Sequence, residues 1–171
     1  MKFFSANVDN LRKLYISELQ RMYSAEVQIA QALPRMIVAA IEPQLRLALE
    51  THLEQTRNHV IRVEEILSQR NGSLEPKKNK SIAALISEGQ DVIEDSTDDS
   101  VRDAGIIGAA QKIEHYEIAV YGTLRTFAEI LGEDAPAQSL EQMLQEEKQA
   151  DAALTEIANT ANMKADKEAL A

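Results

Sequence analysis

The chain has 171 residues, of which 44% are apolar, and it carries a formal net charge of −10. It has no cysteine, which excludes disulfides, thiolate metal sites and cysteine nucleophiles. The acidic balance argues against nucleic acid as a partner. No run approaches the roughly 18 apolar residues of a membrane span, and the first ten residues lack a signal-peptide core. We therefore expect a cytoplasmic protein without a membrane partner.

A first helix is predicted for about residues 7–40, where apolar residues recur every three or four positions. Pro34 falls late in this run and is expected to kink the helix or end it early, because proline lacks an N–H and crowds the preceding turn. A second helix is predicted for about residues 43–70, opened by a proline and closed by Asn71-Gly72. The connection is short, so these helices should be antiparallel neighbours.

The second half of the chain predicts two more long helices, at about residues 99–131 and 136–163, with Gly132 ending the first of them. The interval before them is too long for a hairpin loop and contains a short amphipathic helix at about residues 81–93. The fold class is therefore all-α, a four-helix bundle with a crossover, forming a single domain over residues 1–171. The rival architecture is an irregular helical domain with no shared axis.

Several acids fall on the apolar faces of the last two long helices. Advancing about 100° per residue puts Glu117 at the centre of the apolar arc and Glu114 on its flank, while His115 points outward. Glu147 and Asp151 both fall at the centre of the next arc, four residues apart. A carboxylate facing a helical core costs several kcal/mol unless something compensates it.

The first two helices contribute Glu26 and His52, with His59 less central and Glu54 near the outer face. At 1.5 Å per residue, Glu26, His52, Glu114 and Asp151 come to similar heights in the bundle. Two interpretations remain open. The carboxylates and imidazoles hold two metal ions, Fe or Mn, as in di-metal bundle proteins, or they form a buried network with arginines. The arginines on the arc flanks are Arg57 and Arg125.

The sequence resembles the ferritin-like stress proteins of the bacterial YciE/YciF type. The matching segments lie on all four long helices, so the resemblance covers nearly the whole chain. They are LQRMYSAEVQIAQALPRM (residues 19–36), HLEQT (52–56), VRDAGIIGAAQ (101–111), IEHYEIAVYGTL (113–124) and EEKQADAAL (146–154). The resemblance implies a ferritin-like bundle, a homodimer and a binuclear iron or manganese centre.

The resemblance also implies ligands: Glu26, Glu114 and Glu147 match those of the first, third and fourth helices. The ferritin-like pattern also has Glu-x-x-His on two helices. In this chain the third residue after Glu54 is Arg57, and the third residue after Glu147 is Ala150, so neither pair has the histidine. Three other residues are candidates to replace the missing histidines: Glu117, His52 and Asp151. For the second helix, the family pattern favours Glu54 and the angular position favours His52.

Three functions are compatible with these features. The first is redox chemistry of a di-metal centre with O2 or peroxide, as a peroxidase, a catalase-like enzyme or a ferroxidase, with Tyr23 and Tyr116 placed to intercept oxidants. The second is a non-enzymatic stress or interaction protein that keeps the fold without the chemistry. The third is storage of small cations. No catalytic residue is assigned, because fold-level analogy does not specify a reaction.

Overall fold

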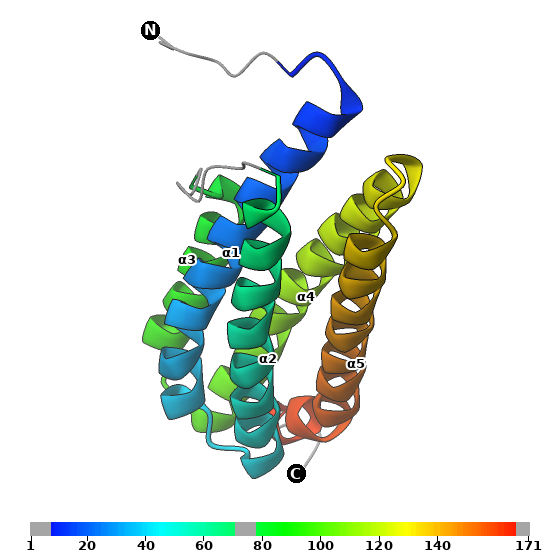
Figure 1. Cartoon of the computed structure of the whole chain (residues 1–171). Coiled ribbons are helices and arrows are strands. Elements are labelled where there is room, and N and C mark those ends of the chain that lie inside the picture. The colour runs from blue at the N-terminus through cyan, green and yellow to red at the C-terminus, as the bar shows by residue number, and fades with distance from the viewer. Residues whose placement is uncertain (1–7, 71–77, 167–171) are drawn as a thin grey trace, which may run out of the picture.

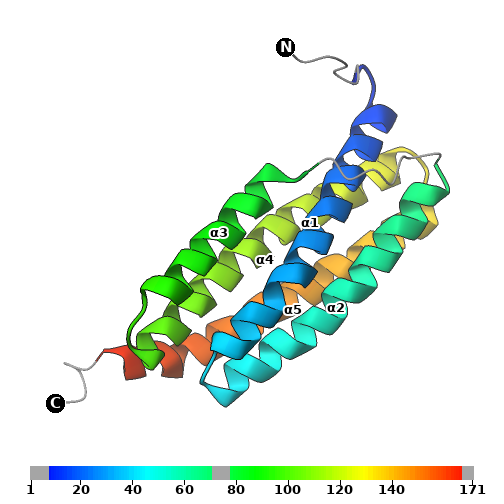
Figure 2. The same cartoon turned by 90° about the vertical axis from the view of Figure 1, so that its left-hand side faces the viewer.

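The computed structural model describes residues 8–70 and 78–166. Within these ranges it contains helices and no strand, in agreement with the all-α prediction. The helices are α1 (Leu11–Ala39), α2 (Pro43–Ser68), α3 (Lys80–Asp95), α4 (Asp99–Ile130) and α5 (Asp134–Ala165). Helices α1, α2, α4 and α5 lie side by side along a common direction (Figures 1 and 2). The bundle is confirmed, and the irregular arrangement is excluded.

The helix directions also agree with the expected topology. Helices α1 and α2 form one antiparallel pair, and α4 and α5 form another (Figure 1). Helix α3 packs against α4 and α1 and returns the chain along the bundle before α4 begins (Figure 2). As a result, α2 and α4 run parallel, as a long crossover with its own short helix requires.

The helix boundaries lie close to the expected ones. Helix α1 passes through Pro34 and continues to Ala39, in agreement with the predicted end near residue 40, so of the two effects expected of Pro34 an early end does not occur. The next apolar turn holds this segment in place, because Met36 is buried in the core. Gly132 follows α4 with a φ of 71°, the left-handed conformation expected after a helix end. The predicted Asn71-Gly72 stop lies outside the described residues.

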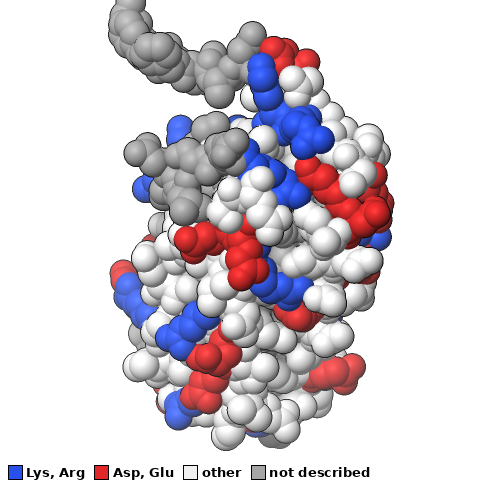
Figure 3. Space-filling view, in the orientation of Figure 1, with Lys and Arg blue, Asp and Glu red and all other residues white. Residues whose placement is uncertain are grey.

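The interior is mainly apolar, with contributions from all five helices. Its fully buried large side chains include Leu19, Leu49, Ile82, Ile107 and Leu124. No helix in the described part of the chain combines the length and apolar character needed to cross a bilayer. On the face seen in Figure 3, acidic and basic side chains are interspersed. This core surrounds a layer of buried carboxylate and imidazole groups.

Asp103 joins the start of α4 to the turn between α1 and α2. It is 4% exposed, and its carboxylate accepts hydrogen bonds from the backbone N–H of Ile41 at 2.9 Å and of Glu42 at 2.7 Å. Asp103→Ala removes both acceptors, so we expect the free energy of unfolding to fall by about 1–3 kcal/mol. Urea denaturation measures this change, with the exposed Asp91→Ala as the control. Equal stabilities of the two variants would contradict it.

Candidate metal centre

A layer of carboxylate and imidazole groups crosses the bundle interior, with side chains from all four long helices. We call these six residues the carboxylate–histidine cluster. They are Glu26 (α1), His52 and His59 (α2), Glu114 and Glu117 (α4) and Glu147 (α5). None is more than 5% exposed. The sequence places these groups in the core because each falls in register with apolar neighbours on its helix.

The cluster extends along the bundle axis because two helices each contribute two members at different heights on the same face. His52 and His59 are seven residues apart, which is two turns on one face of α2. Glu114 and Glu117 are three residues apart and lie next to each other on α4. Since α2 and α4 run parallel, Glu114 lies level with the His52 end of the layer.

The first group of the cluster surrounds His52. Its Nε2 lies 3.4 Å from Glu114 Oε1 and 4.0 Å from Glu117 Oε2, and its Nδ1 lies 3.7 Å from Glu147 Oε2. One nitrogen or oxygen from each of these four side chains lies within 4.8 Å of the others. Four donor atoms at this separation, on three different helices, are arranged as the ligands of one metal ion would be.

The second group comprises Glu26, His59 and Glu147, again with donor atoms within 4.8 Å of one another. His59 Nδ1 lies 2.8 Å from Glu147 Oε1 and 3.5 Å from Glu26 Oε1. The Tyr121 hydroxyl donates a hydrogen bond to Glu26 Oε1, and its ring meets the His59 ring edge-on at 5.8 Å. Glu147 belongs to both groups, so it is the residue that joins the two halves of the cluster.

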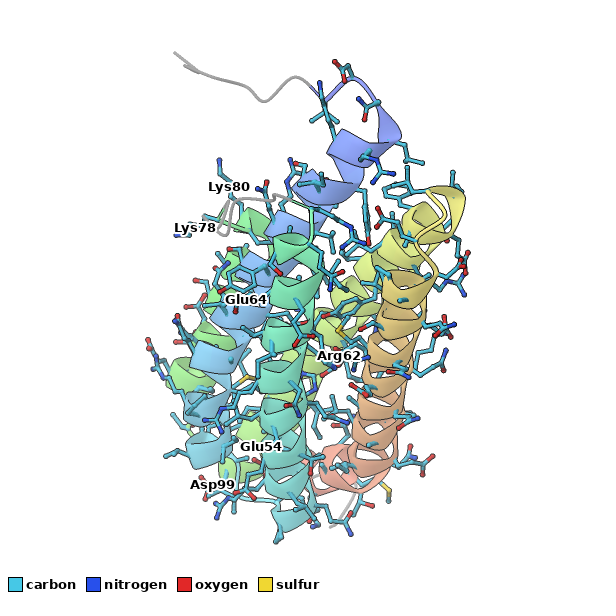
Figure 4. All side chains as sticks on the ribbon, in the orientation of Figure 1. Glu54, Arg62, Glu64, Lys78, Lys80 and Asp99 are labelled. Atoms are coloured by element: carbon cyan, nitrogen blue, oxygen red, sulfur yellow. The ribbon has the colours of Figure 1, made fainter. Side chains whose placement is uncertain are left out.

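A polar chain links His59 to the protein surface. Its Nε2 lies 2.5 Å from Glu146 Oε2, and the other Glu146 oxygen lies 3.5 Å from Arg62 Nη1. Arg62 also donates to the Ser139 carbonyl and to Gln142 Oε1, both at 2.8 Å, and reaches from α2 toward α5 (Figure 4). Partners of this kind fix the orientation of a histidine ring and direct its free nitrogen toward a metal site. Here that nitrogen is Nδ1.

Among the described residues, the buried acids have no lysine or arginine to pair with. Within residues 8–70 and 78–166, no Lys or Arg nitrogen lies within 4.0 Å of the cluster carboxylates, whose ion pairs involve the two histidines. Arg57 pairs with Glu54 at the surface, and Arg125 pairs with Glu141 at 3.0 Å. The arrangement therefore does not form the buried arginine network that was the alternative interpretation.

Each of the six cluster residues has a buried nitrogen or oxygen atom without a hydrogen-bond partner among the described residues. Buried polar atoms of this kind are rare in folded proteins, and a bound ion is one of the explanations. Four carboxylates and two neutral imidazoles carry a formal charge of −4, which two divalent cations balance. A carboxylate and imidazole donor set suits Fe and Mn. These buried histidine and glutamate side chains could therefore hold metal ions.

Burial and crowding perturb the acid–base behaviour of the cluster. Burial, followed by the charge of Glu147, raises the pKa of Glu114 and of Glu117 well above the usual value. Burial lowers the pKa of His52. Burial also disfavours protonated His59, but hydrogen bonds and charges from Glu147 and Glu26 outweigh it and raise the pKa to about 11. In the metal-free cluster, burial and mutual repulsion therefore favour the protonated forms of Glu114 and Glu117, and the neighbouring acids favour protonated His59.

These shifts give the metal-free protein a stability that falls as pH rises. The folded-state pKa values of Glu114, Glu117 and His59 are raised, so each group favours folding below its unfolded pKa and loses that contribution toward its folded pKa. The lowered pKa of His52 acts in the opposite direction below about pH 6.5, where the unfolded histidine is protonated. We therefore expect the free energy of unfolding to decrease by at least about 1 kcal/mol between about pH 7 and 9. Urea titrations with a chelator measure it. A free energy of unfolding that rises over this interval would contradict the raised pKa values of Glu114, Glu117 and His59.

The other sequence candidates lie outside the cluster. The Glu54 side chain is 69% exposed and lies on the outer surface of α2 (Figure 4), so the structure favours His52 over Glu54 on this helix. Asp151 lies at the edge, 23% exposed, where it accepts a hydrogen bond from Gln111 at 3.2 Å. His115 is 67% exposed, as its outward position predicted.

Two residues of the centre, Tyr121 and Glu146, were not among the sequence candidates, and His59 was named only as a less central inward residue. The further signal for His59 is its seven-residue spacing from His52. Tyr121 lies four residues after Glu117, on the same face of α4. Nothing in the sequence distinguishes Glu146, whose role depends on a contact between α5 and α2. The tyrosines that were predicted near the site, Tyr23 and Tyr116, are half-buried and outside the cluster.

A family model described as "Domain of unknown function (DUF892)" matches residues 10–166. The chain belongs to the DUF892 family. It is 40% identical to Protein YciF of Escherichia coli (strain K12) over 165 residues, covering 95% of this chain and 99% of YciF. The resemblance inferred from the sequence is thereby confirmed at the level of the family.

Solved structures show the same fold as this DUF892 chain. The crystal structure of the E. coli stress protein YciF matches with a TM-score of 0.87 and 38% identity, over 92% of this chain and 99% of YciF. YcfI of Rhodopseudomonas palustris, named as a candidate structural protein, matches with a TM-score of 0.85 and 37% identity, over 90% of this chain and 98% of YcfI. A protein of Xanthomonas campestris pv. campestris matches with a TM-score of 0.76 and 26% identity, over 91% of this chain and 95% of that protein.

Proposed function

We propose that this protein binds two Fe or Mn ions in the carboxylate–histidine cluster and uses them in oxygen or peroxide chemistry during stress. The observation that carries the proposal is the set of four buried carboxylates whose ion pairs, within the described residues, involve only His52 and His59. Without a cation, such a set opposes folding. The description of E. coli YciF as a stress protein supports the physiological setting.

The two groups of the cluster divide the ligands between the ions. His52, Glu114 and Glu117 would hold one ion, Glu26 and His59 the other, and Glu147 would contact both. A pair of such ions, when bound, supplies the two electrons that reductive cleavage of an O–O bond requires. The protein excludes bulk water with its apolar core and keeps the ligands oriented, with Tyr121 holding Glu26 and Glu146 holding His59.

Anaerobic loading tests this proposal directly. Metal-free protein is titrated with Fe(II) or Mn(II), the excess is removed, and bound metal is counted by elemental analysis. Hydrogen peroxide or O2 is then added, and metal oxidation and oxidant consumption are followed. We expect two ions per chain and oxidant consumed in proportion to them. Protein that binds neither metal, or binds both and leaves the oxidants unchanged, would contradict the proposal.

Glu146 provides a test of ligand orientation. Glu146→Gln keeps the size of the side chain but weakens the hydrogen bond that holds His59. We expect metal affinity to fall by about 10–100-fold, the usual effect of losing a carboxylate behind a ligating histidine. Competition with a chelator measures the affinity. Glu141→Gln is the matched control, because Glu141 lies on the same helix and pairs with Arg125 instead. Equal affinities of the two variants would exclude this role for Glu146.

The second candidate is a structural or interaction protein that keeps the fold without redox activity. The name given to the R. palustris relative and the missing Glu-x-x-His pairs favour it. Under this alternative, Glu114→Ala and Glu147→Ala retain function and gain stability, because each removes a buried acid. Loss of metal together with activity in these variants would count against it. A homodimer, a cytoplasmic location and a single domain remain predictions from the sequence.

A further inference from the structure

A cavity between α2 and α5 leads to one end of the carboxylate–histidine cluster. It has a volume of about 260 Å³. Exposed residues of both helices, Thr51, Gln149 and Ala153, line its outer part, while the buried His52 and Glu114 lie at its floor. In Figure 3 the lower part of this face has an uncharged area between acidic and basic side chains. The second metal group, around His59, does not line this cavity.

The lining determines what the cavity favours. Apart from the two floor residues, its walls are uncharged and include small or apolar side chains such as Leu49, Ala150 and Leu154. At the floor, both ring nitrogens of His52 and one oxygen of Glu114 lack hydrogen-bond partners among the described residues. An apolar wall with a few convergent polar groups is the usual form of a small-molecule site. The ligand that fits has an apolar body and a polar head directed at the cluster.

The cavity is larger than hydrogen peroxide needs. A water molecule takes about 30 Å³ of liquid, and hydrogen peroxide is only slightly larger. Ala150 contributes only a methyl group to the wall. The cavity therefore has room for a ligand with an organic body.

We propose that this cavity binds an organic hydroperoxide, with its alkyl or aryl body between α2 and α5 and its peroxide group against His52 and Glu114. The inference rests on the proposed function and gives it a substrate class. His52 and Glu114 would hold the nearer metal ion beside the peroxide group. Two bound metal ions, if each gave one electron, would supply the two electrons that, with two protons from solvent, convert one hydroperoxide into one alcohol and one water.

The test fills the cavity without touching a candidate ligand. Ala150→Phe and Ala153→Phe both place a ring in it, and Ala152→Phe is the control on the same helix, exposed and outside the lining. With metal-loaded protein, we expect consumption of cumene hydroperoxide to fall about tenfold or more in the filled variants. Consumption of hydrogen peroxide should stay within about twofold, with unchanged metal content. If Ala150→Phe loses metal, the comparison of cumene hydroperoxide and hydrogen peroxide consumption rests on Ala153→Phe.

A second measurement does not depend on the metal. The product alcohol of cumene hydroperoxide, cumyl alcohol, is titrated into metal-free protein and followed by NMR. We expect it to bind the wild type and the control variant, and to lose binding in the filled variants. Equal binding in all variants, or equal loss of both peroxide activities with metal retained, would overturn the proposal. If the loaded wild type consumes neither peroxide, the proposed function fails, and alcohol binding alone upholds or overturns the cavity as a site.

Discussion

Glu117→Gln is expected to stabilise the metal-free protein and to weaken the stabilisation that metal provides. Glu117 is 0% exposed, both of its carboxylate oxygens lack hydrogen-bond partners among the described residues, and burial raises its pKa strongly. The folded metal-free protein at neutral pH therefore either keeps a buried charge or takes up a proton at a cost in free energy. Glutamine is neutral in both states, so it removes this cost.

We expect the metal-free variant to gain about 1–3 kcal/mol in the free energy of unfolding at pH 8. Saturating metal should stabilise the wild type more than the variant, since a tenfold loss of affinity removes about 1.4 kcal/mol of that stabilisation. Urea denaturation with chelator and with Mn(II) measures both changes. The exposed Glu54→Gln is the control, with changes within about 0.5 kcal/mol. A metal-free Glu117→Gln variant less stable than the wild type would show that Glu117 supports the fold.

Glu147→Gln is expected to have the largest effect on metal binding. Glu147 is the one carboxylate that belongs to both groups of the cluster, with oxygens 3.7 Å from His52 Nδ1 and 2.8 Å from His59 Nδ1. Removing its charge affects both ions, whereas Glu26→Gln and Glu114→Gln each affect one group directly. We expect affinity for both ions to fall by about a hundredfold or more, beyond the loss seen for partners that only orient a ligand.

Calorimetric titration of the metal-free proteins with Mn(II) separates these cases. Glu147→Gln should lose both binding events, and Glu114→Gln mainly one. Glu54→Gln should bind as the wild type does, because Glu54 lies on the outer surface of α2. Near-wild-type binding of both ions by Glu147→Gln would mean that it does not join the two halves, and the division of ligands proposed here would be wrong.

The fold was predictable because its signals are local and repeated. Apolar spacing, proline and glycine positions and connection lengths were sufficient for the helices, the crossover and the directions of α2 and α4. The predicted end of the first helix near residue 40 holds, but whether Pro34 would end the helix earlier could not be decided from the sequence, because it depends on the burial of Met36 in the core. Tertiary burial of this kind cannot be seen in the sequence window around the proline.

Burial was predictable for Glu117 and Glu147, which fall inside an apolar arc and are 0% exposed. Asp151 also falls at the centre of its arc, but its side chain is 23% exposed at the edge of the bundle. Glu114 was placed on the flank of its arc, yet it is 2% exposed, because neighbouring helices cover that flank as well. An angular count treats each helix alone and does not include this cover. His59 was underestimated for the same reason. The contact of Glu146 with His59 joins residues 87 positions apart and has no local signal.

We propose that the buried acids of this protein are compensated by metal rather than by lysine or arginine side chains. Anomalous diffraction at the Fe and Mn absorption edges, from crystals of protein loaded with each metal, tests it most directly. We expect two ions inside the bundle, one against His52, Glu114 and Glu117, the other against Glu26 and His59, with Glu147 touching both. Loaded crystals without an anomalous peak in the carboxylate–histidine cluster would contradict the claim.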